Sequence, residues 1–99
     1  MRAFYDDAHL VEKAQGGDRG ALEQLIALHR AKVHHVALTI LRDPELADEV
    51  VGEVLGHLPT TILSFNGRAR FATWIHQVTR NRAISEQRKQ PKSLSVPLT

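Results

Sequence analysis

The sequence predicts an all-α fold, a compact bundle of about four helices of which one is short. Every stretch with a regular apolar spacing repeats at about 3.6 residues, and no stretch alternates as a strand does. Helix-starting residues precede these stretches, and glycines or an Asn-Gly pair follow them. At 99 residues the chain makes one small domain, expected over residues 1–90, with a flexible linker or tail at 91–99.

The first two helices are expected within residues 6–17 and 17–43. Asp6 or Asp7 is placed to cap the first helix, and Gly16 to end it. Asp18 is a suitable cap for the second helix. Its apolar positions form a long stripe at helical spacing: Leu22, Leu25, Ile26, Val33, Val36, Ala37, Ile40 and Leu41.

The third helix is expected to start where Asp43 caps and Pro44 takes the first helical position. Pro59 should end or kink it. Gly52 and Gly56 are expected inside this helix, where each costs roughly 0.5–1 kcal/mol relative to alanine. The apolar stripe comprises Leu46, Ala47, Val50, Val51, Val54, Leu55 and Leu58.

Residues 60–67 read as a connector, and the last helix is expected from about Arg70 to Lys89. Spacing favours a core role for Phe71, Trp74, Ile75 and Val78 over a ligand role. The opposite side carries no acid and comprises Thr73, His76, Gln77, Arg80, Asn81, Gln87 and Arg88.

After Val78, the apolar and polar residues of this last helix are no longer separated onto opposite sides. Arg82 and Glu86 project toward the inward side, and Ile84 toward the polar side. Either the helix runs off the core there, or Ile84 touches a partner.

Charge is unevenly distributed along the chain, although the net charge is only +2. Residues 43–58 hold five acids and no Lys or Arg, whereas residues 66–92 hold seven Lys or Arg against Glu86 alone. This pattern indicates two surfaces with different partners, or two solvated faces of opposite sign. Donors and forked cations on a helix face suit phosphates and base edges, although such faces are often simply solvated.

Several classes of protein are disfavoured by what the sequence lacks. It has no cysteine, no secretory leader pattern and no apolar run of about 18 residues. None of the six histidines pairs at i, i+4, and His35 is expected to be packed rather than ligating. With no nucleophile–base–acid set and no phosphate loop, we expect no catalysis, no metal and no cofactor.

Three stretches, "LVEKAQGGDRGALEQLI", "DPELADEVVGEVL" and "FNGRARFATWIHQVTRNRAI", occur in this order. Together they resemble region 2 of bacterial RNA polymerase sigma factors of the extracytoplasmic-function (ECF) group. That group commonly shows LV-x-x-A-Q-x-G-D, then D-x-x-x-A-E-D-V-V-Q-E-V-F, then F-x-G-x-x-x-F-x-T-W-L-x-x-I-A-x-N. The resemblance covers about residues 10–90, and the separation from Asp43 to Asn81 fits without a gap.

The resemblance implies a transcription initiation domain, cytoplasmic and nucleoid-associated in a bacterium, and not an enzyme. It implies docking on the clamp coiled coil of the largest subunit of core RNA polymerase through Asp48, Glu49, Gly52 and Glu53. It also implies recognition and melting of the promoter minus-ten element through its non-template strand. The implied DNA-binding residues are Phe65, Asn66, Gly67, Arg68, Arg70, Phe71, Trp74, Gln77, Arg80, Asn81, Arg88 and Lys89.

The sequence departs from the family pattern in the third helix. Gly52 stands where glutamine is usual, Gly56 where an apolar residue is usual and Pro59 where an aromatic is usual. ECF sigma factors carry a second helical domain after a linker, and this sequence stops in "PKSLSVPLT", which resembles the start of that linker. It is either a piece of a longer protein or a stand-alone domain. The alternative function is a degenerate sigma-like module that binds polymerase or an anti-sigma factor without reading DNA.

Overall fold

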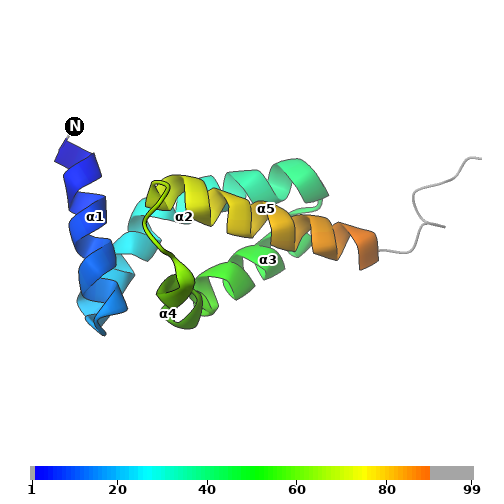
Figure 1. Cartoon of the computed structure of the whole chain (residues 1–99). Helices are drawn as coiled ribbons and strands as arrows, with labels where there is room; N and C mark the ends of the chain where they lie inside the picture. Colours follow the sequence, from blue (N-terminus) through cyan, green and yellow to red (C-terminus); the bar gives the residue numbers. More distant parts are fainter. Residues whose placement is uncertain (1, 90–99) are drawn as a thin grey trace, which may run out of the picture.

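The computed structural model describes residues 2–89 of the chain, which form five α-helices, one 3₁₀ turn and the loops between them (Figure 1). No strand occurs among these residues, so the all-α prediction is confirmed. The predicted tail at 91–99 lies outside the described residues. The elements are α1 (Arg2–Gln15), α2 (Arg19–Leu41), α3 (Pro44–Gly56), α4 (Leu58–Thr61), η1 (Ile62–Ser64) and α5 (Phe71–Lys89).

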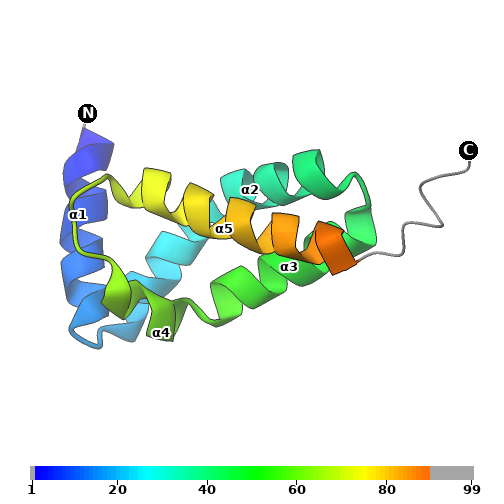
Figure 2. The ribbon, with the colours of Figure 1, turned by 45° about the vertical axis from the view of Figure 1, so that its right-hand side comes forward.

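Three of the helices, α2, α3 and α5, run alongside one another, and α1 crosses them at one end (Figures 1 and 2). The short elements α4 and η1 lie at this same end, where the chain passes beside α1 before it enters α5. The segment expected to be a connector therefore contains helical turns. Ile62 within it is fully buried, which ties the segment to the core.

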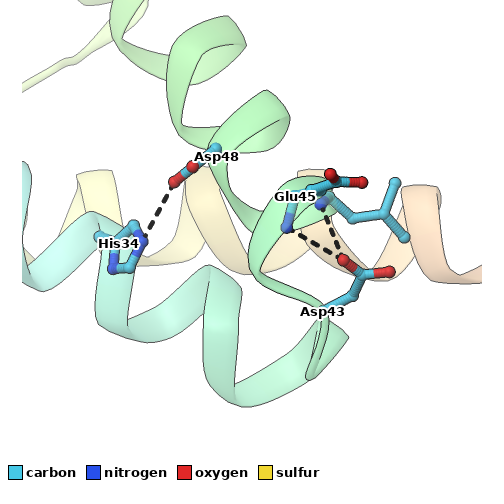
Figure 3. Close-up of polar contacts among 5 residues, drawn as sticks. His34, Asp43, Glu45 and Asp48 are labelled. Atoms are coloured by element: carbon cyan, nitrogen blue, oxygen red, sulfur yellow. Dashed lines mark hydrogen bonds and ion pairs between the residues drawn. The ribbon is translucent and has the colours of Figure 1, made fainter.

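The starts of α2 and α3 are capped as the sequence predicts. Asp18 Oδ1 accepts a hydrogen bond from the Ala21 amide at 3.0 Å. Asp43 Oδ1 accepts from the amides of Glu45 and Leu46 at 3.0 and 3.3 Å (Figure 3). These bonds satisfy amides that have no partner within the helix.

Two predicted helix boundaries are wrong. α1 begins at Arg2, so Asp6 and Asp7 lie inside it and do not cap it. The Asp7 carboxylate instead contacts His29 on α2, a tertiary interaction that sequence spacing does not reveal. α3 ends at Gly56, so Pro59 does not end it and lies in the first turn of α4, where a proline needs no amide partner.

The core lies where the apolar stripes of α2, α3 and α5 meet, together with residues of α1, α4 and η1. Its largest fully buried side chains are Leu25, Leu58, Ile62, Ile75, Val33, Val50 and Thr79. The expectation that His35 is packed is wrong, because it is exposed. His29 is the buried histidine, 9% exposed, since it faces α1 and α5 rather than solvent.

Helix α5 stays on the core beyond Val78. Thr79 and Ala83 are fully buried, and the Thr79 hydroxyl donates to the Ile75 carbonyl at 2.7 Å. Gln87 Nε2 donates to the Ile40 carbonyl at 3.1 Å, which ties the last turns of α5 to α2. The possibility that α5 runs off the core after Val78 is therefore excluded.

Candidate nucleic-acid interface

The loop of residues 65–70, which joins η1 to α5, is held against α1 by one side chain. Gln15 Nε2 donates to the carbonyls of Ile62 and Phe65 at 2.8 and 2.9 Å. Both amide hydrogens of Gln15 are thereby used on the segment that enters the loop. Because these bonds link residues about fifty positions apart, they fix the loop relative to the body of the domain.

The tip of the loop is a tight turn stabilised from within. Asn66 Oδ1 accepts a hydrogen bond from the Arg68 amide at 2.9 Å, the bonding pattern of an Asx turn. Gly67 has φ +79°, a left-handed conformation that side-chain-bearing residues rarely adopt. The turn leaves the side chains of Asn66, Arg68 and Arg70 exposed.

Three aromatic rings support the loop where it meets α5. The Phe65 ring lies 5.7 Å from Phe71 and 5.2 Å from Trp74, and Phe71 lies 5.5 Å from Trp74. His29 packs edge-on against Phe71 at 5.0 Å. Phe71 is only 4% exposed, because neighbouring side chains cover almost all of its surface. Phe65 and Trp74 are half-buried and keep part of their rings accessible.

A pocket of about 420 Å³ opens between α1 and the loop. Phe65, Gly67 and Phe71 line one side of it. Residues of α1 line the other side, among them Asp7, Ala8, Val11, Glu12 and Gln15. Asp7 is also bonded to His29 Nε2 at 3.1 Å, so the pocket wall is braced from α2.

The outward side of α5 is exposed along its length and carries no acid. The exposed residues are those that spacing places away from the core: Thr73, His76, Gln77, Arg80, Asn81, Gln87 and Arg88. Glu86, the acid of this helix, is turned inward and pairs with Arg82 at 3.3 Å. Arg88 and Lys89 occupy the last turn, where cations also favour the helix dipole.

The acids of α3 are partly engaged within the domain. Asp48 Oδ1 lies 3.3 Å from His34 Nε2, an exposed contact between α3 and α2 (Figure 3). Glu53 pairs with Arg82 of α5, which reaches α3 from the inward half of its helix. Glu49 is exposed and has no ion pair among residues 7–89, whose side chains the structure describes.

Gly52 lies on the exposed side of α3, and a Cβ added there would meet nothing within 4 Å. Gly56 is the last residue of α3 rather than an interior position. The predicted cost of a glycine inside the helix therefore applies to Gly52 alone.

Sequence reasoning missed four residues that shape these surfaces: Asp7, Gln15, His29 and Arg82. Their roles depend on contacts between elements, which local spacing does not encode. One feature of the sequence could have drawn attention to Gln15, namely its position in the "AQGGD" stretch directly before the turn that ends α1.

Comparison with known proteins identifies the family. The model for sigma-70 region 2 matches residues 25–92, more than half of the chain. The chain belongs to this family, and several of the relatives that it resembles are named ECF RNA polymerase sigma factors. No solved structure gives a significant match to the chain.

Two curated relatives cover most of the chain. Over 92 residues it is 27% identical to the ECF RNA polymerase sigma factor SigM of Mycobacterium tuberculosis, which covers 93% of this chain and 47% of that protein. Over 91 residues it is 25% identical to the RNA polymerase sigma-H factor of Pseudomonas aeruginosa. This match covers 88% of this chain and 47% of that protein. The chain thus spans about half the length of these relatives.

No helix among residues 2–89 is long and apolar enough to cross a membrane. Among residues 7–89, no three His, Asp or Glu side chains converge as metal ligands would.

Proposed function

We propose that the chain is a transcription initiation module that docks on core RNA polymerase and recognises and melts the promoter minus-ten element through its non-template strand. The observation that carries this proposal is the fixed loop 65–70 beside the exposed, acid-free side of α5. Family membership supports the same role. Polymerase supplies the chemistry, so the chain needs no catalytic group, and it acts in the bacterial cytoplasm, at the nucleoid.

Single-stranded recognition needs stacking surfaces and cations at the backbone. In the proposal, Phe65 and Trp74 offer the accessible aromatic surfaces, while buried Phe71 supports them from below. Asn66 and Gly67 shape the turn that approaches a base. The side chains that meet base edges and phosphates are Arg68, Arg70, Gln77, Arg80, Asn81, Arg88 and Lys89.

Docking on the clamp coiled coil of polymerase is assigned to the exposed side of α3, through Asp48, Glu49, Gly52 and Glu53. Carboxylates on this side attract basic groups of a partner. Of the three acids assigned to docking, Glu49 makes no ion pair with residues 7–89, whereas Asp48 and Glu53 already face His34 and Arg82. Glu49 therefore takes the leading role in the proposed contact.

The proposal is tested by fluorescence anisotropy with a panel of randomised single-stranded oligonucleotides. Binding is measured with and without core RNA polymerase at two salt concentrations. Selective, salt-sensitive binding that polymerase strengthens is the expected result. Polymerase binding with no oligonucleotide selectivity would instead support a module that binds polymerase or an anti-sigma factor alone. Failure to bind DNA with polymerase present would contradict the proposal.

A further inference from the structure

The side of α2 that carries Lys32 presents hydrogen-bond donors and no acid. Residues 24–42 contain no Asp or Glu. Lys32 is exposed and forms no ion pair with residues 7–89. His35 and Thr39 lie within about 60° of Lys32 around the helix, and both are exposed. All three side chains can donate hydrogen bonds to phosphate oxygens, and none of them is among the DNA-binding residues expected from the sequence.

Contacts of α2 with its neighbours show where this side lies. His34 Nε2 lies 3.3 Å from Asp48 Oδ1 of α3. His29 packs edge-on against Phe71 of α5, with ring centroids 5.0 Å apart. At about 100° per residue, Lys32 lies about 160° from His34 and about 60° from His29 around the helix. Lys32 therefore projects away from α3, along the flank of α2 that adjoins α5.

The exposed side of α5 next to α2 also carries donors and no acid. Gln87 Nε2 donates to the Ile40 carbonyl of α2 at 3.1 Å, so the Gln87 side of α5 adjoins α2. Thr73, His76 and Arg80 lie within about 40° of Gln87 around the helix, and all three are exposed. The two helices run side by side in the same direction (Figures 1 and 2), and the axes of packed helices are usually about 8–10 Å apart. The exposed donors of α2 and α5 therefore form two neighbouring rows, which we call the α2–α5 surface.

We infer that the α2–α5 surface holds duplex DNA at the edge of the melted stretch, with Lys32 of α2 on the backbone of the second strand. The inference rests on the proposed function and adds α2 to the elements that contact DNA. In that function one strand follows loop 65–70 and α5, and where the strands are still paired a second backbone lies beside the first. The minor groove separates the two backbones by about 6 Å and the major groove by about 12 Å. Two donor rows about 8–10 Å apart can therefore each meet one backbone, whereas a single strand would leave the row of α2 unused.

The test measures binding of a selected single-stranded oligonucleotide to the full chain in complex with core RNA polymerase. Two further probes add a short duplex arm to its 5′ or its 3′ end, and the gain in affinity from each arm is determined. For one arm, we expect Lys32→Gln to reduce this gain roughly fivefold to tenfold at about 0.1 M salt and to lower the salt slope by about 0.9. Affinity for the bare oligonucleotide should change less than about twofold, and Lys32→Arg, which keeps the charge, should retain most of the gain.

The matched control is Lys13→Gln, which makes the same charge change at an exposed position of α1. It should leave the gain from either arm unchanged. The inference would be overturned, and the proposed function left standing, by an equal reduction in Lys13→Gln, by no reduction in Lys32→Gln for either arm, or by an equal loss for bare and armed oligonucleotides. A loss in Lys32→Arg equal to that in Lys32→Gln would also overturn it. Absence of any DNA binding by the wild-type polymerase complex would overturn both.

Discussion

Loop 65–70 and the exposed side of α3 are held in different ways. The loop is fixed from behind, by Gln15 and by rings whose contacts leave its polar side chains exposed. On α3, by contrast, two of the acids proposed for docking also bind other helices of the domain. Supporting and contacting residues are therefore separate at the loop, whereas at α3 the same side chains serve both purposes.

This difference has a mechanistic consequence. A change at a supporting residue of the loop should lower stability and DNA binding together, whereas a change at its exposed residues should affect binding alone. At α3, a change at Glu53 alters both an internal ion pair and the proposed docking surface.

The largest effect is expected for Phe71→Ala. Phe71 is buried and contacts His29, Phe65 and Trp74, so its loss should lower the free energy of unfolding by about 3–5 kcal/mol. Urea denaturation followed by circular dichroism measures this. Leu63→Ala is the control, because Leu63 is 62% exposed and should cost less than about 0.5 kcal/mol. Equal losses for the two variants would contradict the supporting role.

Gln15→Ala should have the next largest effect. It removes two hydrogen bonds to the Ile62 and Phe65 carbonyls, which should cost about 1–2 kcal/mol of stability. Hydrogen exchange should rise in residues 62–68 more than elsewhere, because the loop loses its tie to α1. Gln24→Ala, at an exposed position of α2, should change neither quantity. Unchanged exchange in the loop would show that Gln15 does not hold it.

A double-mutant cycle on Arg82→Gln and Glu53→Gln sharpens the α3 side of the comparison. The pair is partly exposed, so we expect a coupling free energy of about 0.5–1 kcal/mol in urea denaturation. Arg82→Gln should also strengthen polymerase binding when Glu53 is present and have no effect in Glu53→Gln. Strengthening in both backgrounds would mean that Arg82 does not compete for Glu53.

Gly52→Ala should give a small gain. A Cβ at this position meets nothing within 4 Å, so the variant should stabilise α3 by about 0.5–1 kcal/mol. Thermal or urea denaturation measures the gain. Gly67→Ala is the contrasting variant, because φ +79° makes a side chain there unfavourable and stability should fall. A loss of stability in Gly52→Ala would indicate a contact that the exposed position does not show.

Much of the fold could be predicted from the sequence, because the apolar stripes and the caps at Asp18 and Asp43 act locally. The start of α1 and the break between α3 and α4 could not be predicted in this way. Asp7 has the chemistry of a cap and is used instead in a tertiary pair with His29. The local capping pattern therefore did not predict the role of Asp7, because its partner lies twenty-two residues further along the chain.

In the candidate site, too, features within one helix could be predicted from the sequence, whereas contacts between elements could not. Periodicity alone places Arg80 and Asn81 on the exposed side of α5, since both belong to one helix. The pocket and the tie from Gln15 bring α1 next to a loop about fifty residues later, and no spacing rule predicts that approach. The pairing of Glu53 with Arg82 was hidden for the same reason, because it joins two helices.

The central claim, that the exposed side of α5 reads single-stranded DNA, is tested most directly with the double variant Arg80→Ala/Asn81→Ala. Its binding to the selected oligonucleotide is measured with core RNA polymerase over a range of salt concentrations, beside urea denaturation. We expect stability within about 0.5 kcal/mol of wild type, weaker DNA binding, and a salt slope smaller by about 0.7. Unaltered affinity and slope in a folded variant would contradict the account.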